Sequence, residues 1–106
     1  MKNLNMETMI KRYNKIMNIV GYEHRTIGEP LSEGTENWTI ADMVLECEYV
    51  LSTFFESGHC NEEMRRSEFP EEREEWRREV GLLERFIKTY KTFTDGVKSV
   101  HRYNCF

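Results

Sequence analysis

Histidine and cysteine side chains are the groups in this sequence most able to do chemistry, because they bind zinc and act as nucleophiles or bases. The candidate zinc ligands are His24, Cys47, His59, Cys60, His101 and Cys105. Structural zinc usually takes paired ligands two to four residues apart, a spacing that only His101 and Cys105 have. His59 and Cys60 are adjacent, and one stretch of backbone rarely directs two neighbouring side chains to one ion. We therefore predict no metal ligand and interpret Gly58-His59-Cys60 as a turn at the end of a helix.

Nucleophilic catalysis needs a cysteine within reach of a general base, and the base needs a group that orients it. Cys60 and His101 are candidates for the first two parts, but their separation in the sequence neither supports nor excludes a contact. The chain has no phosphate-binding loop, no G-x-G-x-x-G, no H-E-x-x-H and no G-x-S-x-G. Adjacent carboxylates such as Glu62 and Glu63 point about 100° apart on a helix, so they do not converge. We expect no enzymatic activity, no catalytic residue and no cofactor.

Charge is distributed unevenly along the chain, and the distribution indicates a class of partner. Residues 1–20 carry four basic and one acidic side chain, and residues 80–106 carry five basic and two acidic ones. Residues 21–79 hold six basic and sixteen acidic side chains, a net charge of −10. A block of this charge repels nucleic-acid phosphates and attracts a basic protein surface. The alternative is an acidic face that only keeps the chain soluble.

Partner contacts are expected in residues 62–75, which connect two predicted helices and open the second, where helix packing demands least of the side chains. The carboxylates there stand beside arginines and an aromatic residue, the types in which interface energy concentrates. The predicted partner-binding residues are Glu62, Glu63, Arg65, Arg66, Glu68, Phe69, Glu71, Glu72 and Glu75. The expected function is a non-enzymatic module that binds a basic surface on another protein.

A small DNA-binding transcriptional regulator is the main alternative. Its contacts would come from Lys11, Arg12 and Lys15 or from Arg65 and Arg66. A helix-turn-helix needs a short turn and a basic recognition helix. The connection from Gly58 to Pro70 is too long for such a turn, and residues 71–79 are net acidic. A further alternative is a small zinc-stabilised structural domain.

Two long helices are expected to position these residues. Apolar residues recur at alternating steps of four and three in residues 39–57 and again in residues 70–94, which marks one apolar face on each helix. Both faces are narrow, so the helices pack most simply against each other as an antiparallel pair. We expect Trp76 and Phe54 near one end of the shared core.

The expected helix ends follow from capping residues. Thr39 or Asn37 accepts the free amide hydrogens at the start of the first helix, and Gly58 provides a left-handed stop. Pro70 is tolerated in the first turn of the second helix, because its missing N–H would have had no partner there. Gly96 closes that helix.

The remaining segments complete a mainly α fold. Residues 5–20 carry apolar side chains at helical spacing and end at Gly21, which predicts a third helix against the pair. Residues 22–38 form a connection rich in turn-forming residues, either a working loop or a small β element. Residues 97–106 fit a strand that pairs with the start of this connection as a two-stranded ribbon, or a short helix. We predict one domain over residues 1–106, a small helical bundle.

Composition places the chain among compact folded proteins. A length of 106 residues suits one domain, and 39% hydrophobic with 12% aromatic residues is too apolar for a disordered chain. Three cysteines without a C-x-x-C pair argue against a secreted disulfide framework. The N-terminal stretch has no apolar run of signal-peptide length, and no run of about 20 apolar residues is present to span a bilayer. We expect a cytoplasmic protein without membrane contact.

The segments NWTIADMVLECEYVL and GHCNEEMRRSEFPEEREEWRREVGLLERFI, within residues 37–90, resemble a group of small proteins from gut Firmicutes and their phages or mobile elements. The resemblance includes no catalytic motif and implies no site residue. In size and charge the chain is also similar to many anti-CRISPR proteins, which often block the basic channels of nucleic-acid-guided nucleases. This likeness implies an inhibitor in the host cytoplasm, with a CRISPR effector as its partner.

Overall fold

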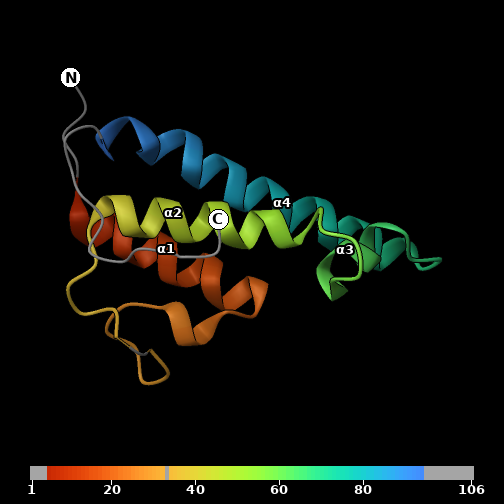
Figure 1. Ribbon diagram of the computed structural model, residues 1–106, viewed down its shortest axis with the longest axis horizontal. Helices are drawn as coiled ribbons and strands as arrows, with labels where there is room; N and C mark the ends of the chain where they lie inside the picture. The colour runs from red at the N-terminus through yellow and green to blue at the C-terminus, as the bar shows by residue number, and fades with distance from the viewer. Residues whose placement is uncertain (1–4, 33, 95–106) are drawn as a thin grey trace.

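The computed structural model describes residues 5–32 and 34–94, which form a mainly α fold (Figure 1). Its elements are α1 (Met6–Val20), a 3-10 turn (Glu23–Arg25), α2 (Ile40–Thr53), α3 (Cys60–Arg65), α4 (Pro70–Tyr90) and a second 3-10 turn (Lys91–Thr94). The predicted helical bundle is confirmed. In this part of the chain, no helix is both long enough and apolar enough to cross a membrane.

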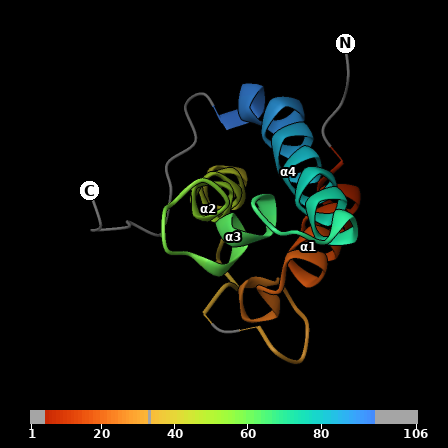
Figure 2. The same ribbon diagram turned by 90° about the vertical axis from the view of Figure 1, so that its right-hand side faces the viewer.

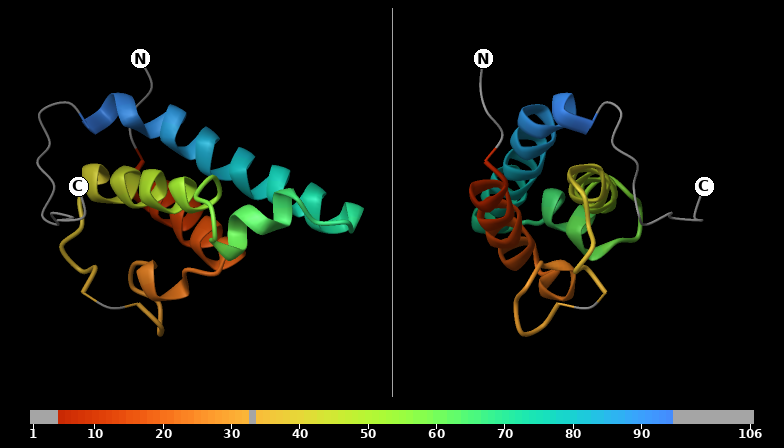
Figure 3. Two further views of the ribbon diagram at one scale, coloured as in Figure 1. Left: turned by 45° about the vertical axis from the view of Figure 1, so that its right-hand side comes forward. Right: turned by 90° about the vertical axis from the view of Figure 1, so that its left-hand side faces the viewer.

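Helix α4 is the element against which the other helices pack, since it contacts α1, α2 and α3. Helices α2 and α4 run antiparallel, as predicted, whereas α1 runs in the same direction as α2 (Figures 1 and 3). An end-on view shows α1 and α4 side by side, with α2 across from this pair (Figure 2). The buried ring of Tyr13 lies 5.9 Å from that of Phe86 and 6.3 Å from that of Trp38. Tyr13 therefore joins α1 to α4 and to the segment that leads into α2.

The long connection between α1 and α2, residues 21–39, is needed because these helices point the same way. The chain has to travel back along α1, about 22 Å for a helix of 15 residues. Asn14 anchors it, because its side-chain amide donates to the Ile27 carbonyl (2.8 Å) and accepts from the Ile27 N–H (2.7 Å). Asn14 thus supplies the partners that a neighbouring strand would supply, and the described part of the connection is a loop without a strand. The tail predicted to pair with it, residues 97–106, and Gly96 lie outside the described residues.

Replacing Asn14 with alanine should destabilise the protein by about 1 to 2 kcal/mol, because both backbone groups of Ile27 would lose their partner in a part-buried position. Asn18→Ala is the matched control, since Asn18 lies about one turn further along α1 and is exposed. Urea unfolding followed by circular dichroism measures the free energy of unfolding of both. Equal stability of the two variants would contradict the anchoring role of Asn14.

The start of α2 and the end of α1 agree with their predicted capping residues. Thr39 and Asp42 form a reciprocal capping box, so Thr39 and not Asn37 is the cap of α2. Helix α1 is capped by the Asn5 side chain and ends at Gly21, whose φ of 86° is left-handed. Local side-chain chemistry is sufficient to place these three helix ends.

The C-terminal end predicted for the first long helix is wrong, and the second helix changes from α to 3-10 before its predicted end. Helix α2 ends at Thr53 rather than at residue 57. The Phe54 carbonyl accepts a hydrogen bond from the Trp76 indole N–H at 3.0 Å, so a group from α4 takes the place of the next turn of α2. Helix α4 ends at Tyr90, and the following residues up to Thr94 tighten into a 3-10 turn.

Candidate functional site

Helix α3 and the first turns of α4 form one end of the molecule and extend beyond α1 (Figures 1 and 3). The sequence did not predict α3, because its six residues are too few to show an apolar period. With α3 present, the turn between α3 and α4 comprises only residues 66–69. The length argument against a helix-turn-helix is therefore wrong. The charge argument stands, since the first turn of α4 is acidic.

Two polar side chains fix the turn that presents Phe69. The Ser67 hydroxyl oxygen accepts from the Phe69 N–H at 3.0 Å, and Arg73 Nη1 donates to the Ser67 carbonyl at 2.6 Å. Pro70 opens α4 without losing a hydrogen bond, because its missing N–H falls in the first turn. Phe69 is consequently held outside the helix packing, with 55% of its surface exposed.

Glu62, which the sequence predicts at the partner surface, is buried. Only 2% of its surface is exposed, and its Oε1 accepts from Arg65 Nη2 at 2.6 Å and lies 3.2 Å from Arg66 Nε. Both arginine side chains remain partly exposed. Glu62 therefore holds two arginines at the surface and does not itself face solvent.

The other predicted carboxylates are on the surface. Glu63, Glu68, Glu71 and Glu72 are exposed, and none of them makes an ion pair with another described side chain. Glu75 is exposed as well, but it lies near Glu79 and helps to raise the pKa of that carboxyl. Glu71 and Glu72 also stabilise α4 itself, since carboxylates in the first turn interact favourably with the positive end of the helix dipole. We call Phe69 and the four unpaired carboxylates (Glu63, Glu68, Glu71 and Glu72) the acidic tip.

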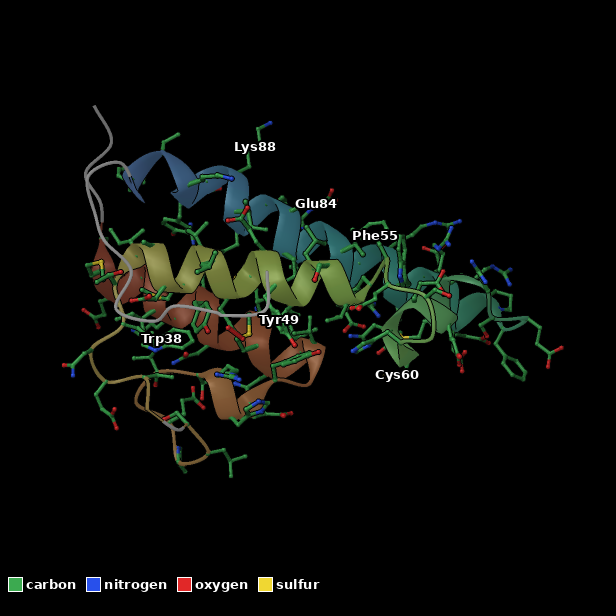
Figure 4. The ribbon with its side chains drawn as sticks, viewed as in Figure 1. Trp38, Tyr49, Phe55, Cys60, Glu84 and Lys88 are labelled. Atoms are coloured by element: carbon green, nitrogen blue, oxygen red, sulfur yellow. The ribbon has the colours of Figure 1, made fainter. Side chains whose placement is uncertain are left out.

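An aromatic pair lies behind the acidic tip. The rings of Phe55 and Trp76 meet edge to face, with centroids 5.3 Å apart and planes at 79°. Phe55 is 55% exposed and is labelled at the junction of α2 and α4 (Figure 4). Trp76 packs at this end of the core beside Phe54, as predicted. The sequence reasoning missed Phe55 because it falls outside the apolar stripe of α2.

The histidines and cysteines are not gathered into one site within the described residues. Gly58 has a left-handed φ of 84° in the turn before α3, as predicted. Cys60 is not part of that turn, because it is the exposed first residue of α3. Cys47 is buried, and burial raises the pKa of its thiol well above the usual value, which keeps it protonated. In the parts of the chain that the structure describes, no three His, Cys, Asp or Glu side chains are placed to hold a metal ion. His101 and Cys105 lie outside those parts, so the absence of metal stays a prediction.

Comparison of the chain with protein-family models, with curated proteins and with solved structures gave no significant match. The resemblance of residues 37–90 to phage and mobile-element proteins therefore stays a prediction. The candidate site rests on the geometry of its own residues.

Proposed function

We propose that this protein is a non-enzymatic binding module whose acidic tip engages a basic surface on a partner protein. The observation that carries the proposal is Phe69, which is 55% exposed in a turn that Ser67 and Arg73 hold in place. An exposed ring fixed in this way contributes little to helix packing. Surrounded by unpaired carboxylates, it has the composition of an interface anchor with a charged rim.

The carboxylates and the ring have different parts in this proposal. Exposed carboxylates speed the encounter with a basic surface and disfavour wrong partners, an effect that salt screens beyond about 10 Å at 0.1 M. Phe69 supplies apolar area at the centre of the contact. Arg65 and Arg66 precede Phe69 in the chain by four and three residues and add planar donors, although both also bind Glu62.

The specific form that we propose is an inhibitor encoded by a phage or mobile element that blocks a host nucleic-acid-guided nuclease of the CRISPR type. Channels that hold nucleic acid are basic, and a projecting tip with four unpaired carboxylates is complementary to such a channel. Such a protein would act in the host cytoplasm and would need no catalytic residue.

A pull-down from host lysate tests the proposal with two variants of equal charge change. The tip variant carries Glu63→Lys, Glu68→Lys and Glu71→Lys. The control variant carries Glu29→Lys, Glu36→Lys and Glu84→Lys, which are exposed carboxylates elsewhere on the molecule. We expect the wild-type and control proteins to recover the same partner and the tip variant to recover less than about a tenth as much.

Circular dichroism and thermal unfolding of the variants show whether each is folded, so that a loss of binding is not a loss of fold. Raising the salt concentration should weaken recovery by the wild-type protein. Equal recovery by the tip variant would defeat the acidic tip as the binding surface. Recovery of nucleic acid alone would defeat the proposal of a protein partner.

A further inference from the structure

We propose a second binding site, a cationic groove between α1 and α4 that takes a small amphipathic carboxylic acid, that is, a carboxylate head on an apolar body. The groove has a volume of about 360 Å³, within the range of about 300 to 1,000 Å³ that small-molecule pockets occupy. Its lining residues come from α1 and α4, which lie side by side (Figure 2). The site does not depend on the acidic tip.

The charges around the groove all have one sign. Arg12 and Lys15 line it from α1 and Arg85 lines it from α4, and no carboxylate is among its lining residues. Lys15 and Arg85 make no ion pair with another residue that the structure describes. In a chain with a formal net charge of −4, three cations without a carboxylate between them mark a local site for an anion.

One of these cations is held in position. Arg12 Nη1 donates to the Tyr90 hydroxyl at 3.0 Å, a contact that bridges α1 and α4 at the groove. An Arg guanidinium has five N–H donors in a fixed fork, so this bond leaves others for a carboxylate. The site therefore has one oriented donor, Arg12, and two further cations, Lys15 and Arg85.

The floor of the groove is apolar and argues for a ligand with an apolar body. Ile19, Leu82 and Phe86 line it, and Ile19 is 43% exposed although it belongs to an otherwise well-packed helix. Inorganic phosphate or a nucleic-acid backbone would cover the cations and leave the exposed part of Ile19 in water. A carboxylic acid with a medium-length alkyl chain or an aromatic ring would cover both the cations and the apolar surface, because burial of apolar area from water is favourable.

A neighbouring hollow extends the site along α1. It shares Lys15 and Ile19 with the groove and is also lined by Lys11 and Asn18. Glu29 lines this second hollow, which makes it less favourable for the anionic head. We therefore place the head beside Arg12, Lys15 and Arg85 and the apolar body over Ile19, Leu82 and Phe86.

Isothermal titration calorimetry with decanoate, below its micelle concentration, tests the groove. Decanol and decyltrimethylammonium have the same chain without the negative charge, and butyrate has the charge with little chain. We expect one decanoate to bind per protein, at least about tenfold more tightly than any of the three comparison compounds. Decanoate should also raise the melting temperature of the protein, as a ligand that binds only the folded state does.

Two charge-reversal variants distinguish the effect of a groove residue on decanoate binding from the effect of the net charge of the protein. Lys15→Glu should weaken decanoate binding at least about tenfold. Lys88→Glu changes the net charge equally but lies on the outward face of α4, and should leave the affinity unchanged (Figure 4). Both substituted side chains are exposed, and circular dichroism shows whether the two variants fold.

Three outcomes would overturn the proposal. The first is no binding of decanoate, or a lowered melting temperature in its presence. The second is equal affinity for decanol, which would make the groove an apolar patch only. The third is binding of a labelled DNA duplex to the wild-type protein but not to Lys15→Glu, combined with no binding of decanoate. This result would assign the cations to nucleic-acid binding.

Discussion

Replacing Trp76 with alanine should lower the free energy of unfolding by about 3 kcal/mol, the low end of the range for large core aromatics, because the ring is only partly buried. The ring packs against the core, meets Phe55 edge to face at 5.3 Å, and donates its N–H to the Phe54 carbonyl at 3.0 Å. That hydrogen bond provides a partner for the carbonyl of the residue that follows α2 and ties this end of α2 to α4. Loss of the side chain would therefore remove packing and leave a carbonyl at the helix end without its partner.

Two further variants separate the parts of this effect. Trp76→Phe keeps most of the ring and loses the N–H, and should lower stability by about 1 to 2 kcal/mol. Phe55→Ala removes the 55% exposed neighbour and should have an effect below about 1 kcal/mol. Denaturant unfolding measures all three changes. A value below about 1 kcal/mol for Trp76→Ala would place the ring outside the core.

Glu79 should make the protein less stable as the pH rises from about 4.5 to 7. Burial of this side chain, followed by the nearby Glu75 carboxylate, raises the pKa of Glu79 from 4.5 to about 7. In the unfolded chain the carboxyl group loses its proton near pH 4.5, whereas in the folded protein it keeps the proton up to about pH 7. Unfolding between these pH values releases a proton, so a higher pH favours the unfolded state.

Glu79→Gln should therefore stabilise the protein at pH 8 by about 2 kcal/mol, a value reduced for partial screening by solvent. Near pH 4 the same change should be close to neutral, because Glu79 is then protonated in both states. Glu84→Gln on the exposed side of α4 is the control. Urea unfolding at both pH values measures the difference. A gain from Glu79→Gln that is equal at both pH values would contradict a proton-linked effect.

The helices that form the bundle were predictable from the sequence because their signals are local. The apolar stripes of α1, α2 and α4 recur at helical spacing, and caps such as Thr39 and Gly21 act on their own backbone. The end of α2 was not predictable, because the carbonyl that follows it finds its partner in Trp76, 22 residues away from Phe54. Helix α3 was missed because six residues do not show a period.

The candidate sites were predictable only in part, for a related reason. Phe69 and the neighbouring carboxylates are exposed because they lie in and just after a connection between helices. The position of this connection was predictable from the sequence. Burial of Glu62 depends on how α3 packs, which the sequence did not predict. The cationic groove requires Arg85 on α4 to face Lys15 on α1, and these residues meet only because α1 packs against α4.

Photo-crosslinking in cells that express the protein tests the central proposal, the protein-binding role of the acidic tip, most directly. Benzoylphenylalanine is placed at position 69 in one variant and at position 31 in another. Leu31 is 66% exposed and belongs to the connection between α1 and α2. This connection lies away from α3 and the start of α4 (Figure 1). We predict a covalent adduct with a basic protein from position 69 and none from position 31. Adducts from position 31 with none from position 69 would contradict the account.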